Sequence, residues 1–317
     1  MRCKNLMLAV ALGVVLPWFL LLSVEPVYYS QQQPTELPTV TQQSNRDDLE
    51  VAVLTADDCV EFMELDDYLL GVVLAEMPAS FEMEALRAQA VVARTFTCKG
   101  MQTSRHGQAA VCTQASCCQA YISADEYIRN GGTEANVQRV KGAVDSTCNQ
   151  VLYYEDELIV ATYFSCSGGR TEDAVAVWGT QVPYLQATDS PGEEDASHYM
   201  DTEIFDVDRF EQLLGGTLDG GIGSVTYTAG GGVETIEIGG ITYTGIQLRQ
   251  KLGLRSTAFT ISIAADKVSV TTKGYGHRVG MSQYGANAMA ASGSGYEEIL
   301  CYYYKGTNLG LIDEMIV

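Results

Sequence analysis

The chain has 317 residues and a mass of 34.3 kDa, and 46% of its residues are apolar. It is long enough for one large domain or two smaller ones, and it is apolar enough to bury a sizeable core, which excludes a disordered polyampholyte. The 19 basic side chains against 40 acidic ones leave a formal net charge of −21. Such a surface repels phosphate backbones, so we expect no nucleic-acid partner, and an anionic substrate would need local positive charge at its site.

The first 24 residues predict a membrane anchor. Arg2 and Lys4 precede an uncharged stretch from Leu6 to Val24, which is long enough to span a bilayer as one helix. A cleaved signal peptide is the main alternative, but the stretch is longer than a signal core and no small-x-small cleavage site follows it. A buried helix of a soluble protein is the other alternative. We therefore expect residues 1–24 to be retained as an anchor. Because the basic flank is N-terminal, we expect the N-terminus to stay cytoplasmic and the rest of the chain to be exported.

Residues 25–48 predict an extracytoplasmic tether. The stretch from Glu25 to Asn45 is rich in Gln, Pro and Thr and has too little apolar surface to fold. A semi-extended segment of this kind would hold residues 49–317 away from the membrane.

Residues 49–317 begin with patterns of both kinds, which predicts a mixed α+β fold. Pro78 ends the first expected helix, and Ser80 is expected to cap the second, whose apolar residues recur every three or four positions. The first expected elements are strands at 51–54 and 60–65 and helices at about 66–77, 80–98 and 135–146.

From Val151 onward the pattern is mainly β. We expect a hairpin at 151–154 and 158–164, strands at 225–227, 235–238, 259–264 and 267–272, and helices at 206–214, 285–291 and 296–303. Residues of about 190–272 are expected to form a smaller β-rich subdomain. The expected fold class is therefore α+β, a mixed helical and antiparallel β domain behind one N-terminal transmembrane helix.

Glu76 is the first candidate catalytic residue. It ends an apolar helix just before Pro78, where the negative end of the helix dipole and apolar neighbours both favour a protonated carboxyl group. A carboxylic acid that stays neutral near pH 7 can protonate a leaving oxygen. A surface glutamate in a last helical turn is the alternative, and chemistry alone favours that ordinary role.

Arg94 is a candidate for binding a ligand. It lies on an otherwise apolar helix, among Ala90, Val91, Val92 and Ala93. A guanidinium in such surroundings is expected to reach for a carboxylate or a ligand. A purely structural ion pair explains the position equally well.

The segment Ser165–Gly169 is a candidate ligand loop. Its glycines and small hydroxyl residues, Ser165, Ser167 and Gly168 among them, allow a backbone to approach a ligand closely. Cys166 also suggests a cysteine nucleophile, with His106, His198 or His277 as its base, but one cysteine and a distant histidine form a weak signature. A tight turn is the structural alternative.

The segment Gly274–Gly285 is a second candidate ligand loop, and it leads into a helix. Four of its side chains suit sugar hydroxyl groups: His277, Ser282, Gln283 and Tyr284. A phosphate cradle is disfavoured because no GK[ST] ending follows the glycines. A turn whose polar groups only cap the next helix is the remaining alternative.

A cluster of cysteines and one histidine predicts a metal site. The chain has 9 cysteines, and a short loop places one imidazole beside three thiols, a set that suits a tetrahedral structural zinc ion. The expected ligands are His106, Cys112, Cys117 and Cys118. A disulfide with spare thiols is the alternative, because an exported protein rich in cysteine usually forms disulfides. Spacing alone favours neither.

Together these segments resemble the stage II sporulation protein D family of Gram-positive endospore formers. The resemblance covers about residues 50–310 in family order. The matching segments are Asp67–Leu69, Gly71–Val72, Glu76–Pro78, Leu86–Thr95, Cys118–Tyr121, Tyr163–Ser165, Ser167–Thr171, Pro183–Leu185 and Gly276–Ala286.

The resemblance implies a lytic transglycosylase that cleaves peptidoglycan glycan strands during engulfment of the forespore. It implies substrate already stripped of peptides by an amidase-endopeptidase, stage II sporulation protein P, and contact with engulfment membrane proteins. The implied location of the catalytic domain, residues 49–317, is the space between mother cell and forespore, anchored to the cell membrane by a single span.

The resemblance also implies residue roles. The family's catalytic glutamate falls on Glu76 and its helix arginine on Arg94. Zinc-binding positions of clostridial members fall on His106, Cys112 and Cys118, while Cys117 replaces a histidine of some members. Many relatives have a histidine at the position of Cys301.

The implied reaction needs one acid–base group. Glu76 would protonate the glycosidic oxygen between N-acetylmuramic acid and N-acetylglucosamine. The resulting carboxylate would then take the proton of the muramic C6 hydroxyl, which closes onto the anomeric carbon to give a 1,6-anhydro end. The alternative from another class is a non-catalytic wall-binding protein, because the domain also resembles amidase enhancers.

Overall fold

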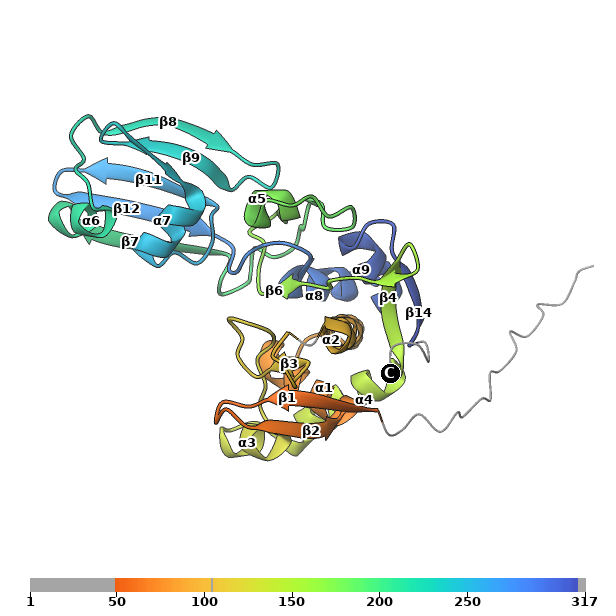
Figure 1. Ribbon diagram of the computed structural model, residues 1–317. Helices are drawn as coiled ribbons and strands as arrows, with labels where there is room; N and C mark the ends of the chain where they lie inside the picture. The colour runs from red at the N-terminus through yellow and green to blue at the C-terminus, as the bar shows by residue number, and fades with distance from the viewer. Residues whose placement is uncertain (1–48, 104, 313–317) are drawn as a thin grey trace, which may run out of the picture. The chain divides into compact units, whose positions relative to one another are not determined.

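The computed structural model describes residues 49–103 and 105–312, which belong to one compact unit, Asn45–Val317 (Figure 1). The predicted anchor and tether, residues 1–48, lie outside the described residues. Among the helices that are described, none is both long and apolar enough to cross a membrane. Helices and several small, mostly antiparallel sheets alternate along the chain, which confirms the α+β fold class.

The N-terminal part forms the larger core around two helices, α1 (Leu65–Glu76) and α2 (Met83–Thr103). Apolar residues cover more than one side of α1, because strands and helices surround it; Tyr68, Leu69, Val72 and Val73 have no exposed area. The neighbouring elements are β1 (Glu50–Leu54), β2 (Val60–Glu64), β3 (Val111–Cys112), α3 (Ala124–Arg129) and α4 (Glu134–Ser146). β1 pairs antiparallel with β2 and parallel with β3.

Two boundaries differ from the sequence prediction. The expected cap at Ser80 is wrong, because a turn in which Phe81 N–H donates to the Pro78 carbonyl at 3.0 Å delays the start of α2 to Met83. The expected hairpin strand at 158–164 is divided in two. Its start, β5 (Glu157–Leu158), pairs with β4 (Gln150–Tyr154), whereas its end, β6 (Tyr163–Phe164), pairs in parallel with a distant segment, β13 (Met281–Ser282).

The C-terminal helices complete the larger core. They are α8 (Gln283–Ala291) and α9 (Tyr296–Tyr303), and β14 (Asn308–Leu311) then pairs antiparallel with β4. The N-terminus of α2 is joined to α8 directly, because Glu82 N–H donates to Asn287 Oδ1 at 2.8 Å. Both helices were expected from the sequence and are confirmed.

A second buried cluster lies between two antiparallel sheets and two helices, which Figure 1 shows in green, cyan and light blue. Phe210, Ile238, Leu248, Val268 and Val270 form its centre. One sheet has the order β11–β12–β7 and the other β10–β9–β8. The elements are β7 (Met200–Asp206), α6 (Val207–Leu214), β8 (Ile222–Tyr227), β9 (Val233–Ile238), β10 (Ile241–Thr244), α7 (Gly245–Leu252), β11 (Phe259–Ala264) and β12 (Lys267–Lys273).

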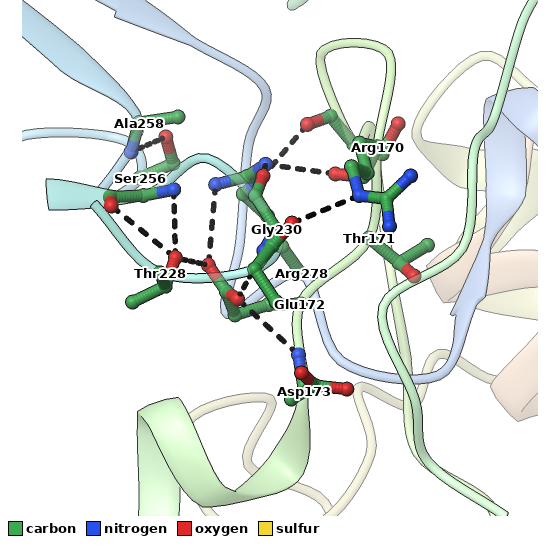
Figure 2. A network of polar contacts seen from close by, with 12 residues as sticks. Arg170, Thr171, Glu172, Asp173, Thr228, Gly230, Ser256, Ala258 and Arg278 are labelled. Atoms are coloured by element: carbon green, nitrogen blue, oxygen red, sulfur yellow. Dashed lines mark hydrogen bonds and ion pairs between the residues drawn. The ribbon is translucent and has the colours of Figure 1, made fainter. Parts of the chain in front are cut away.

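A buried polar network joins the segment after β6, the segment before β13 and the β8–β9 turn (Figure 2). Arg278 is 2% exposed and donates to the carbonyl groups of Ser167, Arg170 and Gly230 at 2.8, 2.7 and 2.6 Å. Glu172, which pairs with Arg278 at 3.8 Å, accepts from Gly230 N–H at 2.9 Å. Gly230 is required there, since a Cβ atom would lie 2.4 Å from the Thr171 carbonyl oxygen. These bonds fix the loops that approach the site described next.

Candidate functional site

A cavity of about 380 Å³ opens beside the end of α1. It is lined by residues that lie far apart in the sequence, because β6 and β13 pair in parallel and bring their loops together. Its polar lining includes Glu76, Cys118, Tyr163, Ser165, His277 and Gln283. The structure therefore brings four of the predicted catalytic and substrate-binding residues to one place: Glu76, Ser165, His277 and Gln283.

Glu76 is the last residue of α1 and is half-buried. Met77 continues in an extended conformation, as expected of a residue before proline, and so the helix ends with Glu76 directed to the cavity. Its Oε1 accepts a hydrogen bond from Ala120 N–H at 2.6 Å. Burial raises the pKa of Glu76 above its ordinary value of 4.5, and the bond from Ala120 opposes part of this shift. The carboxyl group is thus biased toward the protonated form that general acid catalysis needs.

His277 lies in the wall of the cavity and is uncharged at neutral pH. Its ring packs against Phe164 and Trp178, with centroid distances of 5.7 and 5.5 Å. Burial, together with the charge of Arg249, lowers the pKa of His277 to about 4. Nδ1 accepts from Val279 N–H at 3.1 Å, so the ring proton is on Nε2. His277 can therefore offer a neutral ring to a ligand, but not a positive charge.

Ser165 and Gln283 line the same cavity, whereas their predicted companions Ser282 and Tyr284 do not. The Ser282 hydroxyl is buried and caps α8 by accepting from Gly285 N–H at 3.2 Å. The Tyr284 ring packs edge-on against Phe81 at 5.0 Å. Capping, which the sequence analysis kept as the alternative for this loop, is the role that the structure gives to Ser282.

Ser167 and Gly168 bind a carboxylate of the chain itself rather than lining the cavity, which corrects the expectation that they contact substrate. Glu193 is 1% exposed, and its Oε2 accepts from Ser167 N–H at 2.7 Å, Ser167 Oγ at 2.9 Å and Gly168 N–H at 3.2 Å. Its Oε1 accepts from Ser190 Oγ at 2.5 Å. The sequence analysis missed Glu193, because its neighbours in Gly192–Asp195 resemble an ordinary solvated acidic loop.

Cys166 also donates a hydrogen bond to Glu193, and the alternative that it is a cysteine nucleophile is wrong. The side chain is fully buried, and its thiol donates to Glu193 Oε2 at 3.1 Å. Burial, followed by the negative charge of Glu193, raises the pKa of Cys166 to about 12. A thiol that keeps its proton at neutral pH is not an activated nucleophile.

Arg94 lies in the core rather than at the cavity. Its side chain has no exposed area and pairs with Asp66 at 3.1 Å. It also donates to the Thr147 and Val144 carbonyl groups at 2.7 and 3.2 Å, which ties the end of α4 to α2. The structure therefore brings Arg94 to Asp66 and to backbone carbonyl groups, not to Glu76, which is the structural ion pair of the sequence analysis. The expected contact with substrate has no geometric support.

The predicted metal ligands lie together and could bind a metal ion. The ligand atoms of His106, Cys112, Cys117 and Cys118 all lie within 4.8 Å of one another. His106 Nε2 is 3.1 Å from Cys118 Sγ and 3.7 Å from Cys117 Sγ. Within the described part of the chain, these three thiols form no disulfide. One imidazole and three sulfur atoms at this separation are a donor set that suits zinc.

The metal cluster and Glu76 are close neighbours in the fold. Cys118 lines the cavity that Glu76 lines, and Ala120, two residues further on, supplies the backbone hydrogen bond to Glu76. A metal ion that holds the loop of Cys117 and Cys118 in place would therefore also hold the hydrogen bond from Ala120 to Glu76.

Comparisons with known proteins identify the relatives of this chain. The SpoIID family model, described as Stage II sporulation protein, matches residues 55–154. The chain is 40% identical over 270 residues to Stage II sporulation protein D of Bacillus subtilis (strain 168), an alignment that covers 83% of this chain and 79% of that protein. It is 38% identical over 270 residues to the Bacillus amyloliquefaciens protein of the same name, covering 83% and 78% of the two chains. An amidase enhancer of Bacillus subtilis (strain 168) is 28% identical over 298 residues, which cover 76% of this chain and 40% of the enhancer.

Proposed function

Because this chain belongs to the stage II sporulation protein D family, we propose that it acts in sporulation as a lytic transglycosylase on peptidoglycan glycan strands, with Glu76 as its catalytic residue. The observation that carries the proposal is a single carboxyl group with a raised pKa in a cavity of about 380 Å³. Ser165, His277 and Gln283 supply polar and aromatic surface for sugar rings around it.

The cavity contains one carboxyl side chain, Glu76, among the described residues that line it. An ordinary glycosidase uses two carboxyl groups, one as acid and the other as base or nucleophile. A transglycosylase that closes a 1,6-anhydro ring needs one, because the C6 hydroxyl of the muramic acid replaces water. Protonated Glu76 would give its proton to the glycosidic oxygen as the bond to the anomeric carbon breaks. The carboxylate would then accept the C6 hydroxyl proton, which restores the acid.

The four-residue cluster would hold a structural zinc ion in this proposal. His106, Cys112, Cys117 and Cys118 would hold the ion, and bound zinc would cross-link this loop. The chain's own contribution to the reaction is that the loop so fixed places Ala120 N–H at Glu76 Oε1.

Location and partners belong to the same proposal. We propose that residues 1–24 anchor the protein and residues 25–48 tether the catalytic domain, residues 49–317, outside the membrane between mother cell and forespore. Glycan strands freed of peptides by stage II sporulation protein P would be the substrate, and engulfment membrane proteins would be neighbours.

A purified soluble part of the protein, incubated with peptide-free glycan, tests the reaction. The wild type should release products that end in 1,6-anhydro-muramic acid, lighter by one water than hydrolytic products in mass spectrometry. Glu76→Gln should lower turnover by about 10²–10⁴-fold, since it removes the acid–base group. Glu76→Asp should lose about 10²-fold, because it withdraws the carboxyl group by about 1 Å. Glu126→Gln, an exposed glutamate on α3, is the matched control and should keep full activity.

Each other outcome has a defined meaning. Products with reducing ends would show that water attacks, and the transglycosylase proposal would be wrong. Full turnover in Glu76→Gln would remove Glu76 from the reaction. A wild-type protein that binds glycan without cleaving it, but stimulates an amidase, would support the second candidate function, a non-catalytic enhancer; the likeness to the amidase enhancer is the observation that favours it.

A further inference from the structure

A smaller cavity of about 110 Å³, the α2 cavity, adjoins the Glu76 cavity. The two cavities share two lining residues, Phe96 and Cys118. Because a sugar ring carries substituents on several of its carbon atoms, a ring held beside Glu76 can place one of them in the adjoining cavity. The remaining walls of the α2 cavity include Lys99, Thr103, Arg105 and Val160.

Helix α2 forms one side of the α2 cavity. Phe96, Lys99 and Thr103 are three or four positions apart, which places them on one face of the helix. Gly100 allows close packing there, since a Cβ atom would lie 2.8 Å from the Ala110 carbonyl oxygen. The wall that carries Lys99 is therefore set by the packing of α2 against the residues before β3.

The charges in the α2 cavity are opposite to those of the chain as a whole. The chain has 40 acidic and 19 basic side chains, yet the described residues that line this cavity include two basic ones, Lys99 and Arg105, and no acidic one. Lys99 lies 3.8 Å from Glu157, whose side chain is 84% exposed, and an exposed pair of this kind contributes little. Arg105 is exposed and has no ion-pair partner in the described part of the chain. Both cations are available to an anion that a ligand brings.

The rest of the wall is mainly apolar. Val111 is fully buried, and half-buried Phe96 and the exposed Val160 add further apolar surface. A ligand group that suits both features is short and combines a small alkyl part with one negative charge. A carboxylate on a methyl-bearing carbon has this chemistry.

The substrate of the proposed function carries such a group. Muramic acid has a lactyl ether on C3, in which one carbon bears both a methyl and a carboxyl group. In strands with peptides this carboxyl group is an uncharged amide, whereas removal of the peptide leaves a free carboxylate. We propose that Lys99 and Arg105 form a subsite for the free lactyl carboxylate of the muramic acid held at Glu76, and so determine specificity for peptide-free strands. The inference rests on the proposed function for the identity of this sugar.

Charge balance at the metal cluster is the structural alternative for these cations. Arg105 precedes His106, and Cys118 lines the α2 cavity. Three thiolates around one divalent ion carry a net negative charge, which nearby cations would offset. This alternative predicts that removing the cations weakens zinc binding. The subsite predicts that it weakens the binding of charged glycan and leaves zinc in place.

A change in the substrate alone tests the subsite. Zinc-loaded Glu76→Gln protein is titrated by calorimetry with peptide-free glycan fragments, and with the same fragments after their lactyl carboxyl groups have been converted to uncharged amides. The amides should bind about 10-fold more weakly, the effect of losing a charge-assisted hydrogen bond. This preference should shrink as salt is added, because both cations are partly exposed. Equal binding of acid and amide at low salt would overturn the inference.

Charge-removing variants test the two residues. Lys99→Gln and Arg105→Gln should each lose part of the preference for the acid, and the double variant should bind acid and amide equally with its zinc content unchanged. Arg129→Gln, which removes an exposed arginine on α3, is the matched control and should keep the full preference. If Arg105→Gln releases zinc, Lys99→Gln decides, since Lys99 lies on α2 outside the metal loop. A preference that survives removal of the cations, with or without loss of zinc, would overturn the inference.

Cleavage assays separate this inference from the proposed function. With Glu76 intact, the double variant should show a raised KM for peptide-free glycan and an unchanged kcat, because the cations bind substrate without taking part in the reaction. A preference for acid over amide in a protein that cleaves no glycan would refute the proposed function and keep the subsite. Release of 1,6-anhydro products from acid and amide fragments at equal rates and with equal KM would refute the subsite and keep the proposed function.

Discussion

Glu76 and Glu193 are two shielded carboxyl groups of one fold with very different surroundings. Glu193 accepts from two backbone N–H groups, two hydroxyl groups and a thiol, and 1% of it is exposed. Glu76 accepts one backbone hydrogen bond and borders a cavity. Glu193 is enclosed by its own donors and is closed to a ligand, whereas Glu76 borders a cavity that has room for a substrate.

The comparison shows that burial alone does not make a carboxyl group catalytic. What distinguishes the two sites is the number of donors that the fold supplies. A carboxylate that satisfies several donors stabilises the loops which carry them. One with few donors keeps a raised pKa and a function in proton transfer. Removing the charge should therefore lower the stability of the fold at Glu193 and raise it at Glu76.

Metal removal should have the largest effect on stability. It should loosen the loop that donates to Glu76 and leave the loops around Glu193 unchanged. We expect chelation to lower the free energy of unfolding by about 3–4 kcal/mol, the gain from a ligand present at 100 to 1,000 times its dissociation constant. Calorimetry with and without chelator measures the change. Hydrogen exchange should rise at Ala120, which donates to Glu76, and stay low at Ser167 and Gly168, which donate to Glu193.

Two cysteine variants sharpen this prediction. Cys112→Ser removes one of the four possible ligands and should reproduce the effect of the chelator. Cys301→Ser changes an exposed cysteine outside the cluster and should leave the melting temperature unchanged. A protein without bound zinc whose stability does not respond to chelator would contradict the metal site.

Glu193→Gln should have the next largest effect, a loss of about 2–3 kcal/mol in the free energy of unfolding. The amide would turn an NH₂ group toward donors that all point at Glu193, and it would leave some of them buried without an acceptor. Denaturant unfolding measures the loss. Glu194→Gln, the exposed neighbour, is the control and should be neutral. A neutral Glu193→Gln would show that the five donors do not depend on its charge.

The same substitution at Glu76 should have the smallest effect and the opposite sign. Burial raises the pKa of Glu76 above 4.5, so the folded protein holds this proton more tightly than the unfolded chain and loses stability as the pH rises through the folded-state pKa. Glu76→Gln removes the charge and should raise the melting temperature at neutral pH by on the order of 1 °C. The difference from the wild type should vanish below pH 4.5, where both forms are uncharged. A melting temperature lowered at every pH would contradict the raised pKa.

Much of the fold follows from local pattern, because helices with regular apolar faces need little tertiary information. α1, α2, α4, α6, α8 and α9 were all expected, and so were most of the long strands. The division of residues 158–164 was not, since β6 pairs with β13 across more than a hundred positions and no local signal marks the break. The elements α7 and β10 were missed for a similar reason, as glycine clusters around them resemble loops.

The residues of the candidate site also differ in whether a local sequence signal marks them. Glu76 and the metal ligands could be predicted because their chemistry shows in short segments. The roles of Ser167 and Gly168 could not, because their partner Glu193 lies 25 or 26 residues away in an acidic loop without a distinctive pattern. Tyr163, which lines the cavity, was likewise missed as a site residue, since its place beside Glu76 exists only once separate segments have packed.

The contact between Glu82 and Asn287 spans 205 positions of the chain, and it has a consequence for the timing of activity. A polypeptide is made from its N-terminus, and its domains generally fold as units once their residues are available. When the ribosome has completed α1 and α2, Glu76 exists, but Tyr163, His277 and Gln283 do not. The cavity wall is complete only after the start of α8, which carries Gln283, has been made. A nascent chain therefore passes through most of its synthesis with its acidic residue in place and no site around it, and fragments that stop short of α8 should be inert toward any substrate.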